Sequence, residues 1–265
     1  MPQVPPAVKN IIIINVLVFL FQQVMEHRGV PVNNYLALHY VQSPLFRWWQ
    51  LFTHLFMHGG FAHIFFNMFA LWMFGGILEN VWGAPRFILF YIICGVGAAL
   101  CHLGVLSWEF SGFHNAFMAY QAHPTLNEYA HLVSSQHLAP PAFNQVLSFW
   151  SSNPTCGDCA STSIKLLNDY YLSMINEPTV GASGAVFGLL FAFGYLFPNT
   201  ELMLMFPPIP IKAKWFVTIY ALIELTQGIA QSAGDNIAHF AHLGGMLFAF
   251  ILLRIWNNRI RNRFY

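Results

Sequence analysis

Six mainly apolar stretches, each close to the length needed to cross a lipid bilayer, recur along the chain. A membrane-spanning helix needs about 20 such residues, with a range of roughly 17 to 25. The six stretches cover approximately 10–27, 61–79, 86–106, 183–197, 213–231 and 237–256. Only 8% of the 265 residues are charged, against roughly 25% in a soluble domain. The sequence therefore predicts an all-α, polytopic membrane protein whose solvent is the bilayer.

The first apolar stretch predicts a retained membrane span, because only Lys9 precedes it and no small-residue cleavage site follows it. Lys and Arg residues near the span ends set the orientation, since cytoplasmic loops carry an excess of both. With the N-terminus inside, Arg28, Arg47 and Lys165 face outward. The residues that face the cytoplasm are more numerous: Lys9, Arg86, Lys212, Lys214, Arg254, Arg259, Arg261 and Arg263. We therefore expect a multi-pass protein with both termini in the cytoplasm.

Residues 107–178 interrupt the apolar pattern with a long polar and aromatic connection between the third and fourth predicted spans. A connection of this length without structure of its own is unusual, and residues 164–175 are a candidate for a short interfacial helix. With the predicted orientation, the connection lies outside the cytoplasm. We expect one membrane domain of residues 1–265 with an extracytoplasmic insertion at about 107–178.

The four cysteines divide by position. Cys94 and Cys101 lie in an apolar stretch and are expected to be inert packing residues, whereas Cys156 and Cys159 form a C-x-x-C pair in the insertion. An outer, oxidising compartment allows neighbouring cysteines to pair. A disulfide and a reduced pair both remain open at this stage, with the disulfide favoured.

The fourth apolar stretch is short and begins with one hydroxyl group among small residues, in the run Gly181-Ala182-Ser183-Gly184-Ala185-Val186-Phe187-Gly188. A helix too short to cross the bilayer starts partway through it, where irregular backbone must line a cavity or be buried. The unpaired amides of a first helical turn favour negative charge. Ser183 is therefore a candidate nucleophile, and the alternative is an incidental serine in a helix-packing motif.

The sixth stretch contains His239 and His242, and an ionisable residue inside a span is a functional candidate by default. His242, Gly245 and Ala249 share one helical face, so small residues let this helix approach a partner such as the fourth span. A pair of nucleophile and general base, Ser183 and His242, is then geometrically reasonable. For His239 we favour a structural hydrogen bond to a carbonyl group.

Four further donors, His54, His58, His63 and Asn67, lie on or just before the second stretch. His63 and Asn67 are four residues apart and share a helical face. Both suit the stabilisation of an oxyanion, with polar contacts between helices as the alternative. The three histidines also invite a metal-binding interpretation, but neither an H-E-x-x-H motif nor a neighbouring carboxylate supports a hydrolytic zinc site. No metal is therefore expected.

Taken together, these motifs resemble those of the rhomboid proteases. The resemblance covers residues 47–105 and 179–253. The motifs agree in order and spacing: His58 and His63-x-x-x-Asn67 with Gly75-Gly76-x-x-Glu79 beyond them, then Gly181-Ala182-Ser183-Gly184, then Ala241-His242-x-x-Gly245. The resemblance implies a six-helix rhomboid-like bundle with these motifs on the second, fourth and sixth spans. The insertion at 107–178 is the largest departure and lies outside every motif.

The resemblance also implies an intramembrane serine endopeptidase that uses a Ser-His dyad without aspartate. Ser183 resembles the nucleophile and His242 the base, while His63 and Asn67 resemble the side chains of the oxyanion hole. Phe187 can stack on the histidine, where many relatives have tyrosine.

The implied partners are the lipid bilayer and single-span membrane proteins, which are cleaved in or near their transmembrane segments. We expect no cofactor. The net charge of +1 and the lack of a basic stripe exclude nucleic acid as an expected partner. The expected location is a bacterial inner (cell) membrane. The alternative is a catalytically inactive rhomboid-like protein that binds membrane clients, although such relatives typically lack the serine or the histidine.

Glu224 is a carboxylate in the outer half of the fifth predicted span. A carboxylate there is costly unless it is wet, paired or protonated. We expect it to tune the reaction, either at a lateral substrate gate, as the fifth span of rhomboids implies, or through a hydrogen bond to a neighbouring helix. In both roles it is not a catalytic acid, and Glu224→Gln should retain cleavage.

Overall fold

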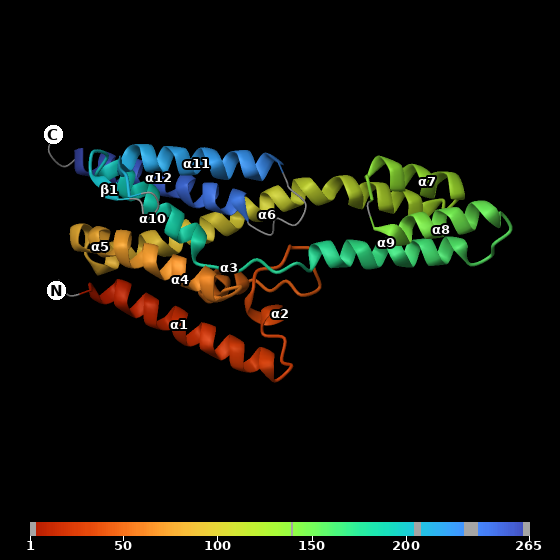
Figure 1. Ribbon diagram of the computed structural model, residues 1–265, viewed down its shortest axis with the longest axis horizontal. Coiled ribbons are helices and arrows are strands. Elements are labelled where there is room, and N and C mark those ends of the chain that lie inside the picture. The colour runs from red at the N-terminus through yellow and green to blue at the C-terminus, as the bar shows by residue number, and fades with distance from the viewer. Residues whose placement is uncertain (1–3, 139, 204–207, 231–237, 262–265) are drawn as a thin grey trace. The chain divides into compact units, whose positions relative to one another are not determined.

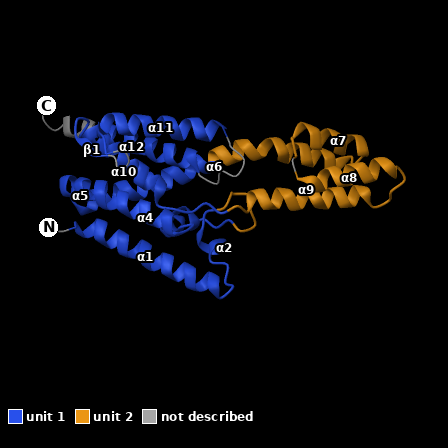
Figure 2. Cartoon of the chain, in the orientation of Figure 1, with its two compact units in different colours: residues 1–38, 46–103, 178–265 blue, residues 39–45, 104–177 orange. Residues whose placement is uncertain are grey.

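The computed structural model describes residues 4–138, 140–203, 208–230 and 238–261, with side chains as far as Trp256, and most of the backbone is helical (Figure 1). The chain divides into two compact units, which Figure 2 draws in different colours. Unit 1 comprises Met1–Leu38, Phe46–Leu103 and Pro178–Tyr265, and unit 2 comprises His39–Leu45 and Gly104–Glu177. Predicted span positions 231 and 237, Arg263, and the side chains of Arg259 and Arg261 lie outside the described residues.

Unit 1 contains the apolar helices. Its elements are α1 (Pro6–His27), α2 (Asn33–Leu36), α3 (Gln50–Thr53), a 3₁₀ turn η1 (His54–Phe56), α4 (Phe61–Ala70), a π-helical turn η2 (Leu71–Gly75), α5 (Gly76–Trp82), the first part of α6 (Ala84–Ala122), α10 (Ser183–Leu196), the antiparallel pair β1 (Glu201–Met203) and β2 (Pro210–Lys212), α11 (Ala213–Ala230) and α12 (His239–Arg261). Four helical stretches are long and apolar enough to cross a membrane: Pro6–His27, Phe61–Trp82, Ala84–Ala122 and His239–Trp256. They match the first, second, third and sixth predicted spans.

The fourth and fifth predicted spans correspond to α10 and α11. α10 has 14 residues, which at about 1.5 Å per residue gives roughly 21 Å, less than the ~30 Å of a hydrocarbon core. The predicted short fourth helix is therefore confirmed. α11 has 18 residues, but Lys214 and Glu224 lower its hydropathy. A helix is present at every predicted range, whereas the number of membrane crossings stays a prediction.

Glu79 explains why a Gly-Gly-x-x-Glu motif ends the second apolar stretch. Its Oε1 atom accepts a hydrogen bond from the Ala7 N–H (2.9 Å), and its Oε2 atom accepts one from the Val8 N–H (2.8 Å). These amides belong to the first turn of α1, which has no side-chain cap of its own. A carboxylate is stabilised there because the amides are otherwise unpaired and the helix dipole is positive at that end. The motif therefore fixes the start of α1 against α5.

Glycines bring α10 and α12 into backbone contact. A Cβ atom added to Gly245 of α12 would collide with the carbonyl oxygen of Gly184 on α10, and one added to Gly188 would lie 3.2 Å from the Gly245 carbonyl oxygen. Helices in lipid associate through such small residues, because the lipid supplies no hydrophobic force between them. The predicted approach of the fourth and sixth helices is confirmed.

Unit 2 is a set of helices around an aromatic core. It consists of the rest of α6, α7 (Leu126–Ser135), α8 (Pro141–Ser152) and α9 (Cys159–Ile175). α9 buries one residue in four along its whole length, namely Cys159, Ser163, Leu167, Tyr171 and Ile175. A stripe of this spacing covers one helical face, so α9 is an amphipathic helix packed along that face.

Most of residues 107–178 are thus helical, and the helix that contains the predicted third span is longer than that span. The helix that was predicted to stop near residue 106 continues as α6 to Ala122, and residues 164–175 belong to the longer α9. Phe113, Phe117 and Tyr120 are buried at helical spacing. Beyond residue 106 the helical signal changes from a run that is apolar all round to an aromatic stripe on one face.

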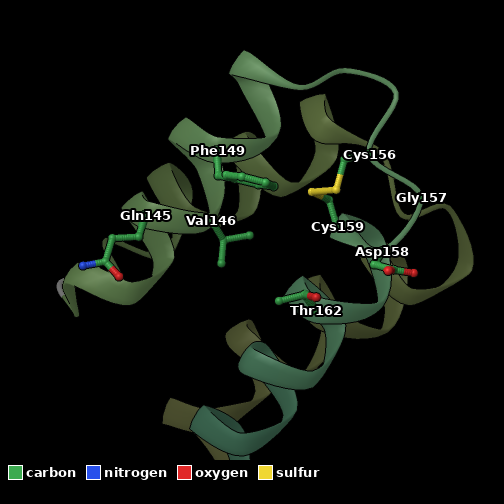
Figure 3. A pocket seen from close by; sticks show the side chains of 8 residues that line it. All are labelled: Gln145, Val146, Phe149, Cys156, Gly157, Asp158, Cys159 and Thr162. Carbon is green, nitrogen blue, oxygen red and sulfur yellow. A yellow bond between two sulfur atoms is a disulfide. The ribbon is translucent and has the colours of Figure 1, made fainter.

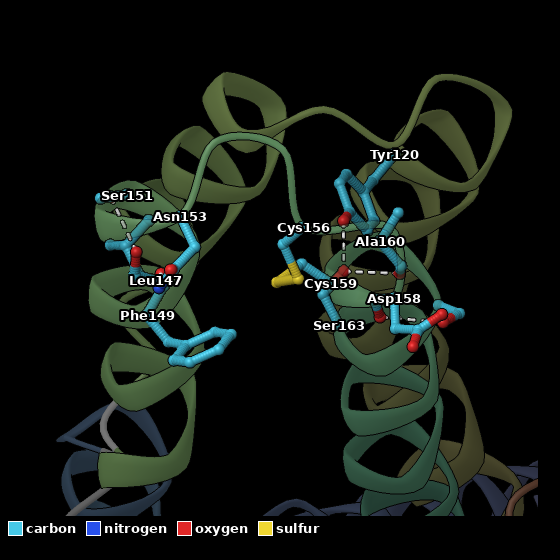
Figure 4. The surroundings of a disulfide bond; sticks show 11 residues. Tyr120, Leu147, Phe149, Ser151, Asn153, Cys156, Asp158, Cys159, Ala160 and Ser163 are labelled. Atoms are coloured by element: carbon cyan, nitrogen blue, oxygen red, sulfur yellow. Dashed lines mark hydrogen bonds between the residues drawn. A yellow bond between two sulfur atoms is a disulfide. The ribbon is translucent and has the colours of Figure 1, made fainter.

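Cys156 and Cys159 form a disulfide at the start of α9, which confirms the favoured alternative (Figure 4). Together with Val146 and Phe149 of α8 and Thr162 of α9, the two cysteines line a pocket of about 450 Å³ (Figure 3). None of the residues that line this pocket belongs to the three sequence motifs. The pocket therefore contributes nothing to the candidate site described next.

Candidate active site

Ser183 is the first residue of α10 and follows an extended segment that is held on both sides. Thr179 and Leu38 exchange two backbone hydrogen bonds (2.8 and 2.9 Å), and the Gly181 N–H donates to the His54 carbonyl oxygen (2.9 Å). Gly181 has a φ of +127°, which a residue with a Cβ atom rarely adopts. This glycine therefore lets the chain turn into α10 and leaves Ser183 in a first turn whose amides are unpaired within the helix.

His63 and Ser183 flank the same glycine. A Cβ atom on Gly181 would lie 2.8 Å from Nε2 of His63 and 3.5 Å from Oγ of Ser183. The Nδ1 atom of His63 accepts a hydrogen bond from the Gly59 N–H (3.3 Å). In the neutral ring the proton is then on Nε2, the atom that faces Gly181. His63 thus presents an N–H donor on the side where Ser183 lies.

Asn67 lies one turn after His63 on α4 and is buried. Its Nδ2 atom has no hydrogen-bond partner within the described part of the chain. Buried donors are nearly always paired. An unpaired amide on the same helical face as His63 is therefore a donor that a bound substrate could use. The arrangement suits a transient anionic oxygen.

His242 of α12 stacks face to face on Phe187, which lies one turn after Ser183 on α10. The ring centroids are 4.1 Å apart and the ring planes differ by 6°. Both Ser183 and His242 are described, and no hydrogen bond joins them. In serine hydrolases this bond commonly becomes short only when substrate is bound.

Glu224 of α11 adds a carboxylate beside the histidine. Its Oε2 atom lies 2.8 Å from Nδ1 of His242 and 2.7 Å from Nδ1 of His239. All three residues are buried. The predicted hydrogen bond from Glu224 to a neighbouring helix is confirmed. The sequence did not reveal that the carboxylate and both histidines form one cluster; its only signal was an ionisable residue in each of two apolar stretches.

The same three side chains could also hold a metal ion. One potential ligand atom from each lies within 4.8 Å of the other two. Two histidines and a glutamate are a donor set that zinc accepts. In this geometry, however, each of the three ligand atoms is already engaged in a charge-assisted hydrogen bond. The hydrogen bonds between the carboxylate and the two histidines therefore account for the convergence of these side chains.

The histidines near the second helix do not form a comparable group within the described residues. Nδ1 of His54 donates to the Gln50 carbonyl oxygen (2.7 Å), and burial lowers the pKa of His54 to about 4. His58 is fully buried and packs edge-on against His63, with ring centroids 5.1 Å apart. The metal-binding interpretation of His54, His58 and His63 gains no support from this arrangement.

Comparisons with known proteins agree with the resemblance of the motifs. The family model described as "Rhomboid domain" matches residues 45–139 and 142–258. An uncharacterized mitochondrial rhomboid protein of Schizosaccharomyces pombe is 25% identical over 262 residues, which cover 93% of this chain and 64% of that protein. The mitochondrial Rhomboid protein 1 of Saccharomyces cerevisiae is 26% identical over 239 residues, 90% of this chain and 49% of that protein.

A bacterial relative matches a shorter region more closely. The rhomboid protease GlpG of Klebsiella pneumoniae is 31% identical over 102 residues, 38% of this chain and 34% of that protein. The chain thus spans less than two thirds of the length of each of these three relatives.

Proposed function

Because this chain belongs to the rhomboid family, whose domain model matches most of its length, we propose that it is an intramembrane serine endopeptidase. Ser183 is the nucleophile and His242 the general base of the reaction. The substrates are single-span membrane proteins, cut in or near their transmembrane segments. The family and the apolar helices make the chain a multi-pass membrane protein, so the reaction takes place at membrane depth.

The proposed reaction is acyl transfer in two steps. Ser183 Oγ attacks the carbonyl carbon of the scissile peptide while His242 takes the hydroxyl proton. The carbon–nitrogen bond then breaks, and His242 returns the proton to the leaving amine. Water attacks the resulting acyl-enzyme, again with His242 as base, and Ser183 is regenerated.

The oxygen that becomes negative in both steps needs donors that are already in place. We assign this role to the Ser183 N–H and the side chains of His63 and Asn67. The His63 Nε2–H faces Gly181, which also lies close to Ser183 Oγ, and the buried Nδ2 atom of Asn67 has no partner among the described residues. A preorganised donor of this kind is worth about 10²–10³ in turnover.

The observation that carries the proposal is the contact between α10 and α12. Gly184 and Gly245 let the two backbones touch, and Phe187 stacks on His242 one turn after Ser183. A serine at the start of one helix and an oriented histidine on the next are the two parts that a serine protease requires. No cofactor takes part in the proposed reaction.

We further propose six membrane crossings with both termini in the cytoplasm and unit 2 outside it. The excess of Lys and Arg near the span ends on the expected cytoplasmic side supports this topology. The 39 residues of α6 correspond to roughly 58 Å, so this helix is long enough to extend beyond the ~30 Å of a hydrocarbon core. The proposed location is a bacterial cell membrane. Two relatives are named as mitochondrial, so the compartment needs its own test: reporter fusions at each terminus and at residue 153 should report cytoplasm, cytoplasm and outside.

The test of the activity uses purified protein in liposomes with a model single-span substrate. We expect cleavage by the wild-type protein and none by Ser183→Ala. A fluorophosphonate probe, which reacts with activated serines, should label the wild-type protein at Ser183. A folded wild-type protein that binds single-span clients but neither cleaves them nor reacts with the probe would instead be a catalytically inactive rhomboid-like protein.

A further inference from the structure

Glu224 holds a position that the proposed two-residue mechanism does not use. It is 5% exposed and lies on the face of α11 that carries the buried residues Val217 and Gly228. A Cβ atom on Gly228 would lie 3.2 Å from Cβ of His239, so the glycine lets α11 approach α12 closely. Glu224, one turn earlier, is thereby directed at the two histidines of α12.

The contacts of the carboxylate determine which nitrogen of His242 carries a proton. An ionised carboxylate only accepts hydrogen bonds, so Nδ1 of His242, 2.8 Å from Glu224 Oε2, is the donor. In the neutral ring Nε2 is then the unprotonated atom, and its lone pair can accept a proton. This is the tautomer that a general base for Ser183 requires.

The orientation of the His242 ring is fixed in two independent ways. Phe187 stacks on its face with an interplanar angle of 6°, which restricts tilting of the ring. The hydrogen bond to Glu224 restricts rotation within the ring plane, since rotation would break a charge-assisted bond. The two contacts together leave one orientation.

We propose that Glu224 is a positioning residue of the reaction, the third member of a chain Ser183–His242–Glu224. It holds His242 in the tautomer and orientation needed for proton transfer and stabilises the imidazolium that forms when His242 takes the proton from Ser183. The inference rests on the proposed protease function. It replaces the expectation from sequence that Glu224→Gln leaves the reaction largely intact.

His239 has a supporting part in this arrangement. Its Nδ1 atom donates to the same Oε2 oxygen at 2.7 Å, so the buried carboxylate retains one partner whatever the state of His242. A buried carboxylate without a donor is destabilising. We therefore assign His239 to keeping Glu224 ionised and in place.

The test compares Glu224→Ala and Glu224→Gln with one matched control, Glu79→Gln, and with His239→Ala as a supporting variant. Glu79→Gln neutralises another buried carboxylate of unit 1, one whose partners are the backbone amides of α1. His239→Ala removes the second donor to Glu224. For each folded variant we would measure Tm, kcat and KM for the model substrate, and the rate of fluorophosphonate labelling of Ser183.

In Glu224→Ala, kcat and the labelling rate should fall by about 10²–10⁴, the contribution of a general base, with KM unchanged. Glu224→Gln keeps an oxygen that can accept from both histidines but removes the charge that strengthens these bonds and stabilises the imidazolium, so an intermediate loss is expected. Glu79→Gln should lower Tm without changing kcat of the folded fraction. His239→Ala leaves Glu224 with His242 as its donor, so kcat should fall, but less than in Glu224→Ala. A merely structural role for Glu224 would lower Tm and leave kcat per folded molecule intact.

Three outcomes would overturn the inference. Wild-type kcat in folded Glu224→Ala or Glu224→Gln, beside an active wild-type protein, would refute the positioning role alone. Loss of wild-type activity on chelation with recovery in zinc would make Glu224 a metal ligand instead. A wild-type protein that neither cleaves nor labels would refute the proposed function itself, and with it any base for Glu224 to position.

Discussion

Both units bury mainly apolar side chains, but they differ in the polar groups that they bury and in the apolar groups that they expose. Unit 1 exposes large apolar residues on its outer helices, such as Phe61 at 76% and Ile229 at 69%, and buries Glu79, Glu224 and His242. In unit 2 the buried side chains are mainly aromatic and aliphatic, such as Phe113, Tyr129, Phe143 and Leu167. Among the described residues, the large apolar side chains exposed on unit 2 are Val41, Trp108, Met118 and Phe149.

The difference shows what each unit uses burial for. With unit 2 outside the bilayer, as proposed, the removal of apolar surface from water stabilises its fold, so its interior needs no chemistry. In unit 1 the lipid would accept apolar side chains as readily as the interior does. A polar group buried there gains nothing from lipid and must be paired or have a function. The buried polar groups of unit 1 are therefore where the chemistry is expected.

The largest contrast between the units should come from removing one hydroxyl group in each. Ser183→Ala, His242→Ala and the double variant should each lose cleavage by about 10⁴-fold or more, and the double variant should be no worse than either, because the two groups act as one unit. Ser163→Ala, a buried serine of unit 2, should retain turnover. If His242→Ala cleaves the substrate and His239→Ala does not, then His239, and not His242, is the general base.

A smaller effect should follow from removing the donors on α4. His63→Ala and Asn67→Ala should each lower kcat by about 10²–10³ with little change in KM, because an oxyanion forms only in the transition state. Steady-state kinetics with the model substrate separates the two parameters. A change restricted to KM would place both residues in substrate binding or in helix packing.

In unit 2 a core truncation should change stability without changing chemistry. Leu167 is fully buried in α9, and Leu167→Ala should lower the free energy of unfolding of unit 2 by about 2–5 kcal/mol. Fluorescence of the buried Trp150 during urea titration would follow the transition. The turnover per probe-reactive Ser183 should equal that of the wild-type protein; a fall in that ratio would show that the units are not separable in function.

The disulfide of unit 2 should matter less. Closing a loop as short as the one between Cys156 and Cys159 is worth about 1–2 kcal/mol in the chain-entropy description. The Cys156→Ser, Cys159→Ser double variant should therefore be slightly less stable and fully proteolytic. Thiol labelling before and after reductant should reveal two added thiols in the wild-type protein. Abolished proteolysis in a folded double variant would give this pair a part in the reaction.

The smallest expected effect is that of chelators. Ser183 and His242 supply nucleophile and base, so EDTA or phenanthroline should leave the rate unchanged. The comparison requires the same liposomes with and without chelator, followed by added zinc. Inactivation by chelators that added zinc reverses would contradict the proposed metal-free mechanism and would indicate a metal bound by histidines of unit 1.

The sequence predicted the parts of unit 1 whose signals are local. The short fourth helix, the glycines that join α10 to α12 and the spacing of His63 and Asn67 are all readable within a few residues. The length of α6 was missed because its pattern changes along the chain. Residues 86–106 are apolar all round, whereas from residue 107 onward only the stripe of Phe113, Phe117 and Tyr120 is buried.

The environment of Glu224 could not be predicted for a different reason. An ionisable residue in an apolar helix indicates that a partner exists, but not which one. The partners here lie on another helix, 15 and 18 residues along the chain. Their selection depends on the rotation of α11 against α12, which the close approach at Gly228 permits. Tertiary packing of this kind has no local signature.

The stacking of Phe187 on His242 gives the protein a spectroscopic label of its own. Protons held over the face of an aromatic ring are shielded by its ring current, so the imidazole protons of His242 should resonate upfield of the usual histidine range. The shift should return to the ordinary range in Phe187→Leu, which would assign the signal to His242. Nuclear magnetic resonance could follow the imidazole of His242 through substrate binding without any added reporter group.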